Sequence, residues 1–196
     1  TSETIERFRL GFALDSWDGL LNYLHQEGVA PEQAMAAGLA RERRGRGGFY
    51  DLFRGRLVIP IEDERGRVVA FGARILPGSE TSDRDAPKYV NSPETAVYRK
   101  SKILYGLPHA RTAIQRRERL IVVEGYFDVM AMVQAGFAET VATCGTALTA
   151  EHIRLIRPHT STVMVLFDSD DAGQRAAIRS LELFLDAGIQ ARRVEF

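Results

Sequence analysis

The order of hydrophobic and polar positions changes along the chain, and its second part has a regular rhythm. From residue 120 onward, short apolar runs alternate with segments of helical spacing. The runs LIVVEG, ETVATC, TVMVLFD and QARRVEF occupy residues 120–125, 139–144, 162–168 and 190–196, and residues 126–136, 149–158 and 171–188 lie between them. Continuous apolar strands that alternate with helices are typical of a parallel sheet covered by helices. We therefore predict an α/β fold for this part.

The first part predicts a mixture of helices and antiparallel strands. Residues 15–28 carry leucines on one face behind an Asp15/Ser16 cap signal, and residues 31–38 begin with Pro31 and end with Gly38. Residues 56–63 and 67–76 predict a hairpin around the turn DERG, and residues 77–96 predict a long irregular loop. The basic helix end QRRER marks a predicted boundary, which gives one domain over residues 1–116 and another over residues 117–196.

The apolar strands of the second domain end in carboxylates. Glu124 follows the first strand, and Asp168 and Asp170 follow the third. The carboxyl ends of parallel strands share one edge, where such sheets bind ligands. Gathered acids repel one another unless a cation lies among them, and oxygen ligands without His or Cys favour Mg²⁺ or Mn²⁺ over zinc. The pattern predicts a divalent-metal site with two or more ions, of the kind that serves phosphoryl transfer.

Each acid also has a purely structural interpretation. Gly125 allows a sharp turn after Glu124, so Asp128 can face the same space as Glu124 or only complement a helix N-terminus. Asp168 and Asp170 point to the same side if the strand continues, and otherwise the sequence DSDDAG is a helix-capping cluster.

Composition narrows the class of protein. The chain has 196 residues, of which 45% are apolar, enough for one large or two small domains. No apolar run reaches the length of a membrane span and no signal peptide is visible, so no membrane partner is predicted. The single cysteine, Cys144, excludes an internal disulfide and suits the reducing cytoplasm, which we predict as the location. The four histidines lack zinc-ligand spacing.

Positive charge is placed unevenly. Residues 1–116 carry 18 Lys and Arg against 15 Asp and Glu, and residues 117–196 carry 8 against 11. A basic part joined to an acidic part suits a protein that holds a polyanion and metal ions, although ordinary solvated surfaces explain the counts as well. All three lysines, Lys88, Lys100 and Lys102, fall in one short window, either by chance or to contact a nucleotide phosphate.

The segment from residue 41 to residue 56 combines arginines with aromatic side chains. It holds six Arg, with Phe49, Tyr50 and Phe53 between them. Such a segment can follow the backbone and stack on the bases of a nucleic-acid single strand. The alternative is that the aromatic residues belong to the core and the arginines are simply solvated.

These motifs together resemble a known family. The sequences VVEGYFDVMAMVQAGF, VATCGTALTAEHI and LFDSDDAGQRAA resemble the Toprim fold of topoisomerases, primases and recombination nucleases. In the first part, GFALDSWDGLLNYL, FRGRLVIPIEDERGRVVAFGAR, PKYVNSPET and YRKSKILYGL resemble the catalytic core of bacterial DnaG-type replicative primases. The resemblance extends from about residue 8 to residue 196.

The resemblance implies a mixed α/β N-terminal subdomain followed by a Rossmann-like Toprim subdomain. The implied reaction is synthesis of short RNA primers on a single-stranded DNA template from ribonucleoside triphosphates, which leaves an RNA–DNA hybrid. It implies Glu124, Asp168 and Asp170 as catalytic residues and metal ligands, with Asp128 as a further ligand. The residues implied in nucleotide and template binding are Arg74, Lys88, Asn91, Lys100, Gly145 and Thr146.

Three parts of the family pattern are not found in this sequence: the zinc-binding module, the helicase-binding region and the acidic motif DPD. We therefore expect a core fragment with an incomplete ligand set and weak or no activity by itself. We expect the replicative helicase to be bound through a C-terminal region outside this sequence. Two other functions stay open, a Toprim nuclease or strand-passage enzyme and a sensor that binds nucleotides or alarmones on a primase-like scaffold.

Overall fold

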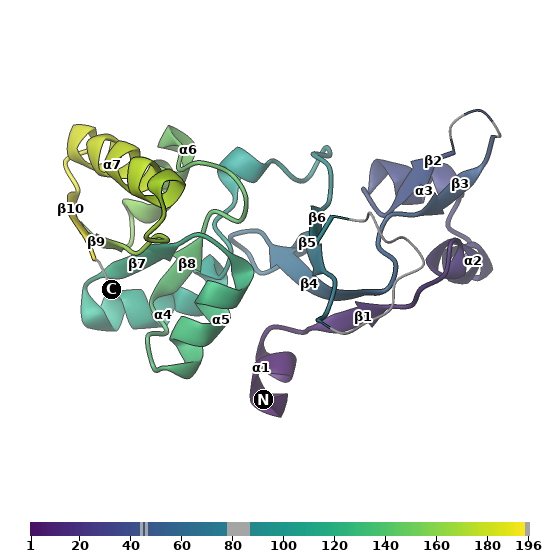
Figure 1. The fold of residues 1–196 in the computed structure, drawn as a ribbon, viewed down its shortest axis with the longest axis horizontal. Helices are drawn as coiled ribbons and strands as arrows, with labels where there is room; N and C mark the ends of the chain where they lie inside the picture. The colour runs from purple at the N-terminus through teal and green to yellow at the C-terminus, as the bar shows by residue number, and fades with distance from the viewer. Residues whose placement is uncertain (44, 46, 78–86, 195–196) are drawn as a thin grey trace. The chain divides into compact units, whose positions relative to one another are not determined.

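The computed structural model describes residues 1–43, 45, 47–77 and 87–194, and the chain forms two compact units. The first unit comprises Thr1–Ile61 and Val68–Tyr98, and the second comprises Glu62–Arg67 and Arg99–Phe196. No helix in the described part of the chain is both long and apolar enough to cross a bilayer. Figure 1 shows the elements of both units with the labels used below.

The second unit is built on a four-stranded parallel sheet with the order β10-β9-β7-β8. Its strands are β7 (Leu120–Val123), β8 (Thr140–Ala142), β9 (Thr162–Val165) and β10 (Gln190–Arg193). The chain passes from β7 to β8 on one side and then returns to β9 on the other side of β7. The gap between the ends of β7 and β9 is therefore a topological switch point, the usual ligand position in such sheets.

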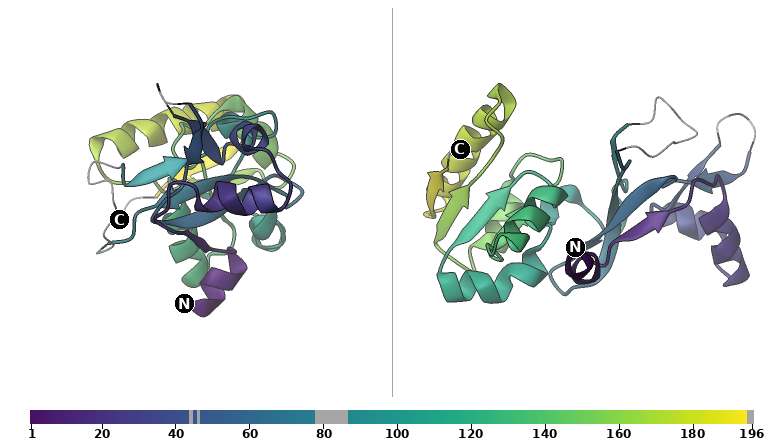
Figure 2. Two further views of the ribbon diagram at one scale, coloured as in Figure 1. Left: turned by 90° about the vertical axis from the view of Figure 1, so that its right-hand side faces the viewer. Right: turned by 60° about the horizontal axis from the view of Figure 1, so that its bottom comes forward.

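Helices connect these strands as the sequence predicts. They are α4 (Leu107–Arg117), α5 (Tyr126–Gln134), α6 (Ala150–Ile156) and α7 (Asp171–Asp186), with the short 3₁₀ helix η1 (Lys100–Lys102) ahead of α4. Helices α6 and α7 cover one face of the sheet and α5 covers the other (Figures 1 and 2). Right-handed crossovers require this placement when strand order reverses at β7.

The largest hydrophobic core lies in the second unit. Strand side chains meet those of α4, α6 and α7 in one cluster, whose fully buried members include Leu107, Ile114, Leu120, Val122, Val141, Ile156, Val163, Val165 and Phe184. Apart from partly exposed Thr162 and Met164, strands β7, β8 and β9 have buried side chains at every position, as expected for a parallel sheet covered on both faces. Cys144 is also buried.

The first unit contains a second four-stranded sheet, of order β1-β4-β5-β6. Its strands are β1 (Gly11–Ala13), β4 (Arg56–Glu62), β5 (Val68–Arg74) and β6 (Tyr89–Asn91). Strand β1 pairs antiparallel with β4, and β6 pairs antiparallel with β5. The predicted hairpin of β4 and β5 is thus present. Strand β6 lies where the sequence predicted only an irregular loop, and residues 78–86 of that loop lie outside the described residues.

The turn between β4 and β5 belongs to the second unit. Inside the turn, the Arg67 carbonyl accepts a hydrogen bond from the Asp63 N–H at 2.9 Å. Glu62 pairs with His109 of α4 at 3.0 Å, and Glu64 lies 3.9 Å from Arg111 of the same helix.

The remaining elements of the first unit are short. They are α1 (Ser2–Arg7), α2 (Gly19–Gln26), α3 (Pro31–Ala36) and the antiparallel pair β2 (Ala40–Glu42) and β3 (Phe49–Asp51). Helix α3 begins at Pro31, as predicted, and Gly38 follows it with a positive φ of 72°. A small core forms around Leu21, Ala34 and Ala40.

Helix α2 is capped from a distant strand. The sequence predicted a local cap at Asp15 and Ser16, but α2 begins at Gly19 and its N-cap residue, Asp18, makes no side-chain cap. Instead, buried Asp51 of β3 accepts hydrogen bonds from the Leu20 N–H at 2.7 Å and the Leu21 N–H at 3.0 Å. The predicted cap position is therefore wrong, because a carboxylate 30 residues further along the chain satisfies these amides.

Candidate active site

Glu124 lies at the switch point and is held from both sides. It directly follows β7, and its backbone carbonyl accepts a hydrogen bond from the Cys144 N–H beyond β8 at 3.0 Å. Its carboxylate Oε1 accepts one from the Asp168 N–H beyond β9 at 2.8 Å. The parallel register that pairs Val122 with Val165 brings these segments, 44 residues apart, side by side. Glu124 therefore links the ends of three adjacent strands.

Asp128 and Asp170 each cap a helix. Asp128 lies in the first turn of α5, and its Oδ2 accepts a hydrogen bond from the Gly125 N–H at 2.8 Å. Asp170 is the N-cap residue of α7, and its Oδ1 accepts one from the Gly173 N–H at 2.7 Å. The capping interpretation thus holds for both residues. In each carboxylate the second oxygen makes no hydrogen bond with the described residues.

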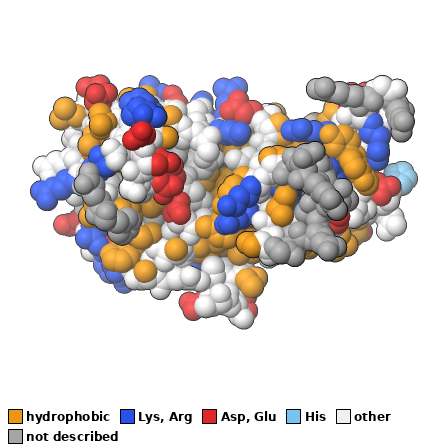
Figure 3. Space-filling view, viewed as in Figure 1, with side chains coloured by type: hydrophobic (Ala, Val, Ile, Leu, Met, Phe, Trp, Pro, Cys, Tyr) orange, Lys and Arg blue, Asp and Glu red, His pale blue; other side chains and the backbone are white. Residues whose placement is uncertain are grey.

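The four carboxylates interact electrostatically. Burial raises the pKa of Glu124, and the negative charges of Asp168, Asp170 and Asp128 raise it further, against the lowering effect of the Asp168 N–H. Burial also raises the pKa of Asp128, with a contribution from Asp168. Figure 3 shows Asp and Glu side chains gathered on the second unit. Within the described ranges, however, no three Asp, Glu, His or Cys side chains converge closely enough to hold a metal ion.

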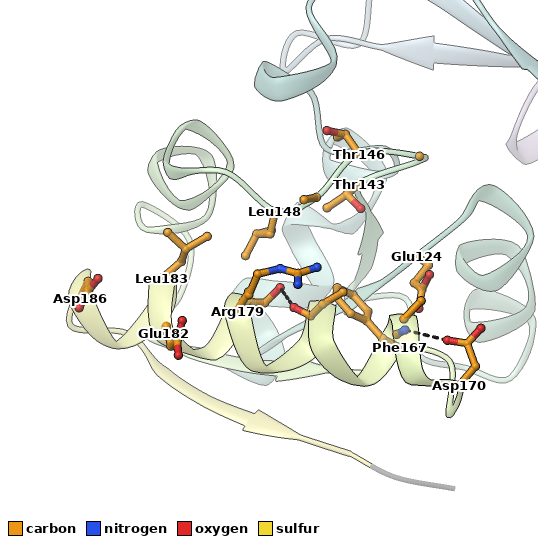
Figure 4. A pocket seen from close by; sticks show the side chains of 16 residues that line it. Glu124, Thr143, Thr146, Leu148, Phe167, Asp170, Arg179, Glu182, Leu183 and Asp186 are labelled. Carbon is orange, nitrogen blue, oxygen red and sulfur yellow. Dashed lines mark hydrogen bonds between the residues drawn. The ribbon is translucent and has the colours of Figure 1, made fainter.

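A groove of about 640 Å³ opens beside Glu124 and Asp170. One wall is α7, and the other is the loop that carries Thr143, Thr146 and Leu148 (Figure 4). The structure places Gly145 and Thr146, both implied by the resemblance, in this lining. A separate hollow of about 360 Å³ is lined by Asp128 and Asp168, so two of the acids face each space.

Two site residues escaped the sequence reasoning. Arg179, on α7, lies along the groove between the acids at its two ends (Figure 4). Its position nine residues after Asp170 gave no local signal. Gly173 is buried in the first turn of α7, where a methyl group would stand 2.3 Å from the Asp168 carbonyl oxygen and 3.0 Å from Glu124 Oε1. A glycine inside a helix was the available signal for this close approach.

The predicted basic residues fall in both units. Arg74 ends β5 with its guanidinium 5.2 Å from the ring centre of Tyr89 in β6. Lys88 precedes β6, and its carbonyl accepts hydrogen bonds from the Ile75 N–H at 3.1 Å and the Arg56 guanidinium at 3.3 Å.

Asn91 ends β6, where it pairs with Gly72 of β5. Arg74, Lys88 and Asn91 therefore share one edge of the first unit. Lys100 belongs to the second unit, on η1.

The Arg-rich segment contributes to a partly exposed aromatic cluster with Trp17. The rings of Trp17 and Tyr50 meet edge to face at 5.6 Å, and the Arg54 guanidinium lies 4.1 Å from the Trp17 ring centre and 5.2 Å from that of Tyr50. Arg43 lies 5.4 Å and 5.9 Å from the same two rings. By contrast, Phe53 is buried and belongs to the core. The stacking interpretation therefore remains for Tyr50 alone among the three predicted aromatics, since Phe49 also packs on a core cluster.

Both arginines of this cluster are fixed by the backbone. Arg54 donates to the Asp51 carbonyl at 2.6 Å, and Arg43 donates through Nε to the Phe49 carbonyl at 3.2 Å. No carboxylate of the described residues forms an ion pair with either guanidinium. Trp17 is 48% exposed. Within the described part of the chain, the cluster thus presents two guanidinium groups that have no carboxylate partner and lie beside two aromatic rings.

Comparison with known proteins identifies the family. Residues 1–111 match the model of the DNA primase catalytic core, N-terminal domain, and residues 118–195 match the Toprim domain. The chain belongs to the DnaG-type DNA primase family. This confirms the family predicted from the sequence motifs, and the mixed α/β fold with a parallel Toprim sheet is confirmed as well.

Relatives in this primase family share much of the sequence and fold. DNA primase of Deinococcus radiodurans is 45% identical over 193 residues, which cover 98% of this chain and 33% of that protein. The Aquifex aeolicus primase structure with zinc-binding and RNA polymerase domains superposes with a TM-score of 0.88 at 35% identity, over 100% of this chain and 47% of that one.

A structure of a DnaG primase catalytic domain bound to single-stranded DNA gives a TM-score of 0.86 at 40% identity, over 100% of this chain and 60% of that one. The chain thus spans about a third of the length of the curated relative in Deinococcus radiodurans.

Proposed function

We propose that this chain is the catalytic part of a primase, a nucleotidyltransferase that joins ribonucleoside triphosphates into short RNA primers on single-stranded DNA. Family membership supports the reaction, and the DNA-bound relative supports the template. The observation that carries the proposal is the set of four interacting carboxylates at the switch point of the Toprim sheet. On this proposal the protein works in the cytoplasm, leaves an RNA–DNA hybrid, and meets the replicative helicase through a region outside this sequence.

The carboxylates suit hard divalent cations. Glu124, Asp168, Asp170 and Asp128 offer only oxygen donors, the ligands that Mg²⁺ and Mn²⁺ prefer. Positive charge would also relieve the repulsion that raises the pKa of Glu124. We assign Glu124, Asp168 and Asp170 as catalytic residues and metal ligands, with Asp128 as an additional ligand. Bound cations would supply charge stabilisation to the attacking and leaving oxygens of nucleotidyl transfer.

Cationic and polar side chains are assigned to the phosphates. We propose that Lys100 of the second unit contacts a phosphate group of the nucleotide or template. We propose nucleotide or template binding for Arg74, Lys88 and Asn91 of the first unit as well. Gly145 and Thr146 would lie against the nucleotide, since they line the groove that also holds Glu124.

The aromatic cluster is assigned to the template. Single-strand binding surfaces combine stacked rings with guanidinium groups. Trp17 and Tyr50, with Arg43 and Arg54 fixed beside them, match that chemistry. We propose that one template base stacks on this cluster while its phosphate pairs with an arginine.

The decisive test is a pair of charge-removing substitutions in the full-length protein. Gln at position 124 keeps an oxygen for the Asp168 N–H but loses the negative charge, so Glu124→Gln isolates the electrostatic role. We expect Glu124→Gln and Asp168→Asn each to abolish primer synthesis with Mg²⁺ or Mn²⁺, measured by incorporation of labelled ribonucleotides on single-stranded DNA. Template binding, measured by fluorescence anisotropy, should survive.

Asp171→Asn is the matched control, because Asp171 neighbours the site but is not among the charges that raise the Glu124 pKa. It should leave primer synthesis unchanged. Normal primer synthesis by both Glu124→Gln and Asp168→Asn would refute the proposal. Cleavage of plasmid DNA, with no primer synthesis by the wild-type protein, would favour a Toprim nuclease instead.

A further inference from the structure

The turn that carries Lys100 is held in place by α6. A 3₁₀ turn of three residues is weak by itself, since its hydrogen bonds are few and poorly aligned. Here two successive carbonyls of η1 accept hydrogen bonds from α6 and its N-cap residue: that of Lys100 from His152 Nε2 at 3.0 Å, and that of Ser101 from Thr149 Oγ1 at 2.9 Å. The partners are 52 and 48 residues apart in sequence, so these bonds fix the turn on the Toprim unit.

The hydrogen bonds determine the tautomer of His152. The Thr149 N–H points at Nδ1 from 3.2 Å, so Nδ1 accepts and the ring proton resides on Nε2. Nε2–H therefore donates to the Lys100 carbonyl. His152 is fully buried, and this burial lowers its pKa, which favours the neutral ring that the arrangement requires. Both ring nitrogens are thus used in structural hydrogen bonds.

Thr149 joins the same turn to the groove. It ends the loop whose residues Thr143, Gly145, Thr146 and Leu148 line the groove beside Glu124. Its hydroxyl also accepts a hydrogen bond from the His152 N–H at 3.2 Å, which caps α6. One capping motif therefore fixes the groove-lining loop at its end and holds η1 at the same time.

We propose that His152 and Thr149 are positioning residues that set where Lys100 presents its ammonium group to phosphate. This inference rests on the proposed function, in which Lys100 contacts a phosphate of the nucleoside triphosphate or of the template. His152 touches neither and acts through the backbone of Lys100, with a further backbone contact at Ile103, the residue that ends the turn. Its substitution should weaken phosphate binding without changing the carboxylate chemistry at Glu124.

Two replacements of His152 separate its two hydrogen bonds. A Gln amide reaches the position of Nε2 and can still donate to the Lys100 carbonyl, whereas an Asn amide reaches only the position of Nδ1 and keeps the cap. In the full-length protein, we expect His152→Asn to raise the KM for ribonucleoside triphosphate, or the Kd for a labelled oligothymidylate, roughly three- to tenfold, the effect of one lost hydrogen bond. The value of kcat should stay near that of the wild type. His152→Gln should restore most of the affinity.

The ligand whose affinity falls identifies the phosphate that Lys100 contacts. Equal affinity for both ligands in His152→Asn and wild type would overturn the inference. The inference would also be overturned if the Asn and Gln variants lost affinity equally and their unfolding midpoints fell equally. The role of His152 would then be to stabilise the fold. Arg154→Ala, at an exposed position of the same helix, is the matched control and should bind as the wild type does.

Lys100→Met separates this inference from the proposed function. If Lys100→Met weakens binding and His152→Asn does not, only the inference fails. If Lys100→Met changes neither affinity, the assigned role of Lys100 fails and the inference with it. Because His152 acts through Lys100, adding His152→Asn to Lys100→Met should produce no further loss, whereas additive losses would contradict the positioning role.

Discussion

Gly173→Ala is the sharpest test of how the acidic site is built. The added methyl carbon would stand 2.3 Å from the Asp168 carbonyl oxygen and 3.0 Å from Glu124 Oε1, both well inside the 3.4 Å at which ordinary van der Waals contact begins. The first of these atoms belongs to the backbone, so it cannot rotate away. Helix α7 and the segment around Asp168 must therefore separate.

The expected displacement is 3.4 Å less 2.3 Å, or about 1.1 Å, if the carbonyl moves directly away. Crowding of this kind destabilises a fold by about 1–3 kcal/mol, and the better helix propensity of alanine returns up to about 1 kcal/mol. The net loss of stability is therefore about 0–3 kcal/mol. A misplacement of about 1 Å in a catalytic group can lower a rate about 100-fold. We expect primer synthesis to fall by about that factor while the protein stays folded.

Steady-state primer synthesis and urea unfolding measure the two effects separately. Gly11→Ala is the matched control, because a methyl group there meets no atom within 4 Å and should change neither quantity. A Gly173→Ala protein that works at nearly the wild-type rate would refute the argument that this close approach sets the position of Asp168. A protein that no longer folds would refute the estimate of its stability.

Three further predictions follow from single side chains. Because the pKa of Glu124 is raised in the fold, its ionised form opposes folding above that pKa. Glu124→Gln should therefore raise the thermal unfolding midpoint at about pH 8 in the absence of divalent cation, and this gain should disappear below about pH 4. Added Mn²⁺ should stabilise the wild type more than the variant. Asp51→Ala should lower the free energy of unfolding by about 1–2 kcal/mol in urea titrations, whereas Asp18→Ala, which removes no cap, should have little effect. Trp17→Ala should weaken oligothymidylate binding by about 1–3 kcal/mol in anisotropy titrations. Tyr23→Ala removes an exposed ring outside the cluster and should leave binding unchanged. Equal affinities in the two variants would contradict the template assignment.

The second unit was predictable from sequence because its signals are local. Strands β7, β8 and β9 lie in mostly apolar runs, and the segments between them have helical spacing, so their alternation indicated the parallel sheet and the edge at which Glu124 and Asp168 lie. Strand β10, by contrast, is mostly polar. The strands proved shorter than the runs, since β9 ends at Val165 and leaves Phe167 and Asp168 in the connection to α7. Hydrogen bonds between neighbouring strands determine where each strand ends, and a run of apolar residues does not reveal these hydrogen bonds.

Features that depend on distant residues escaped prediction. Strand β6 is three residues long and exists through its pairing with β5, so its own sequence gives little evidence of it. Trp17 joined the Arg-rich cluster only because α2 packs beside β3 in the first unit. The role of Gly173 depends in part on Glu124, 49 residues earlier, whose Oε1 would stand 3.0 Å from an added methyl group. In each case, the contact that determines the structure joins two segments that no periodic sequence pattern connects.

The cap of α2 also bears on the order in which the first unit folds. Isolated helices shorter than about 12 residues are marginal in water, and α2 has 8. Its first free amides are satisfied by Asp51, which arrives only when β3 has docked. Helix α2 should therefore form late, together with the β2–β3 pair, and during synthesis it should stay unstructured until at least residue 51 has left the ribosome.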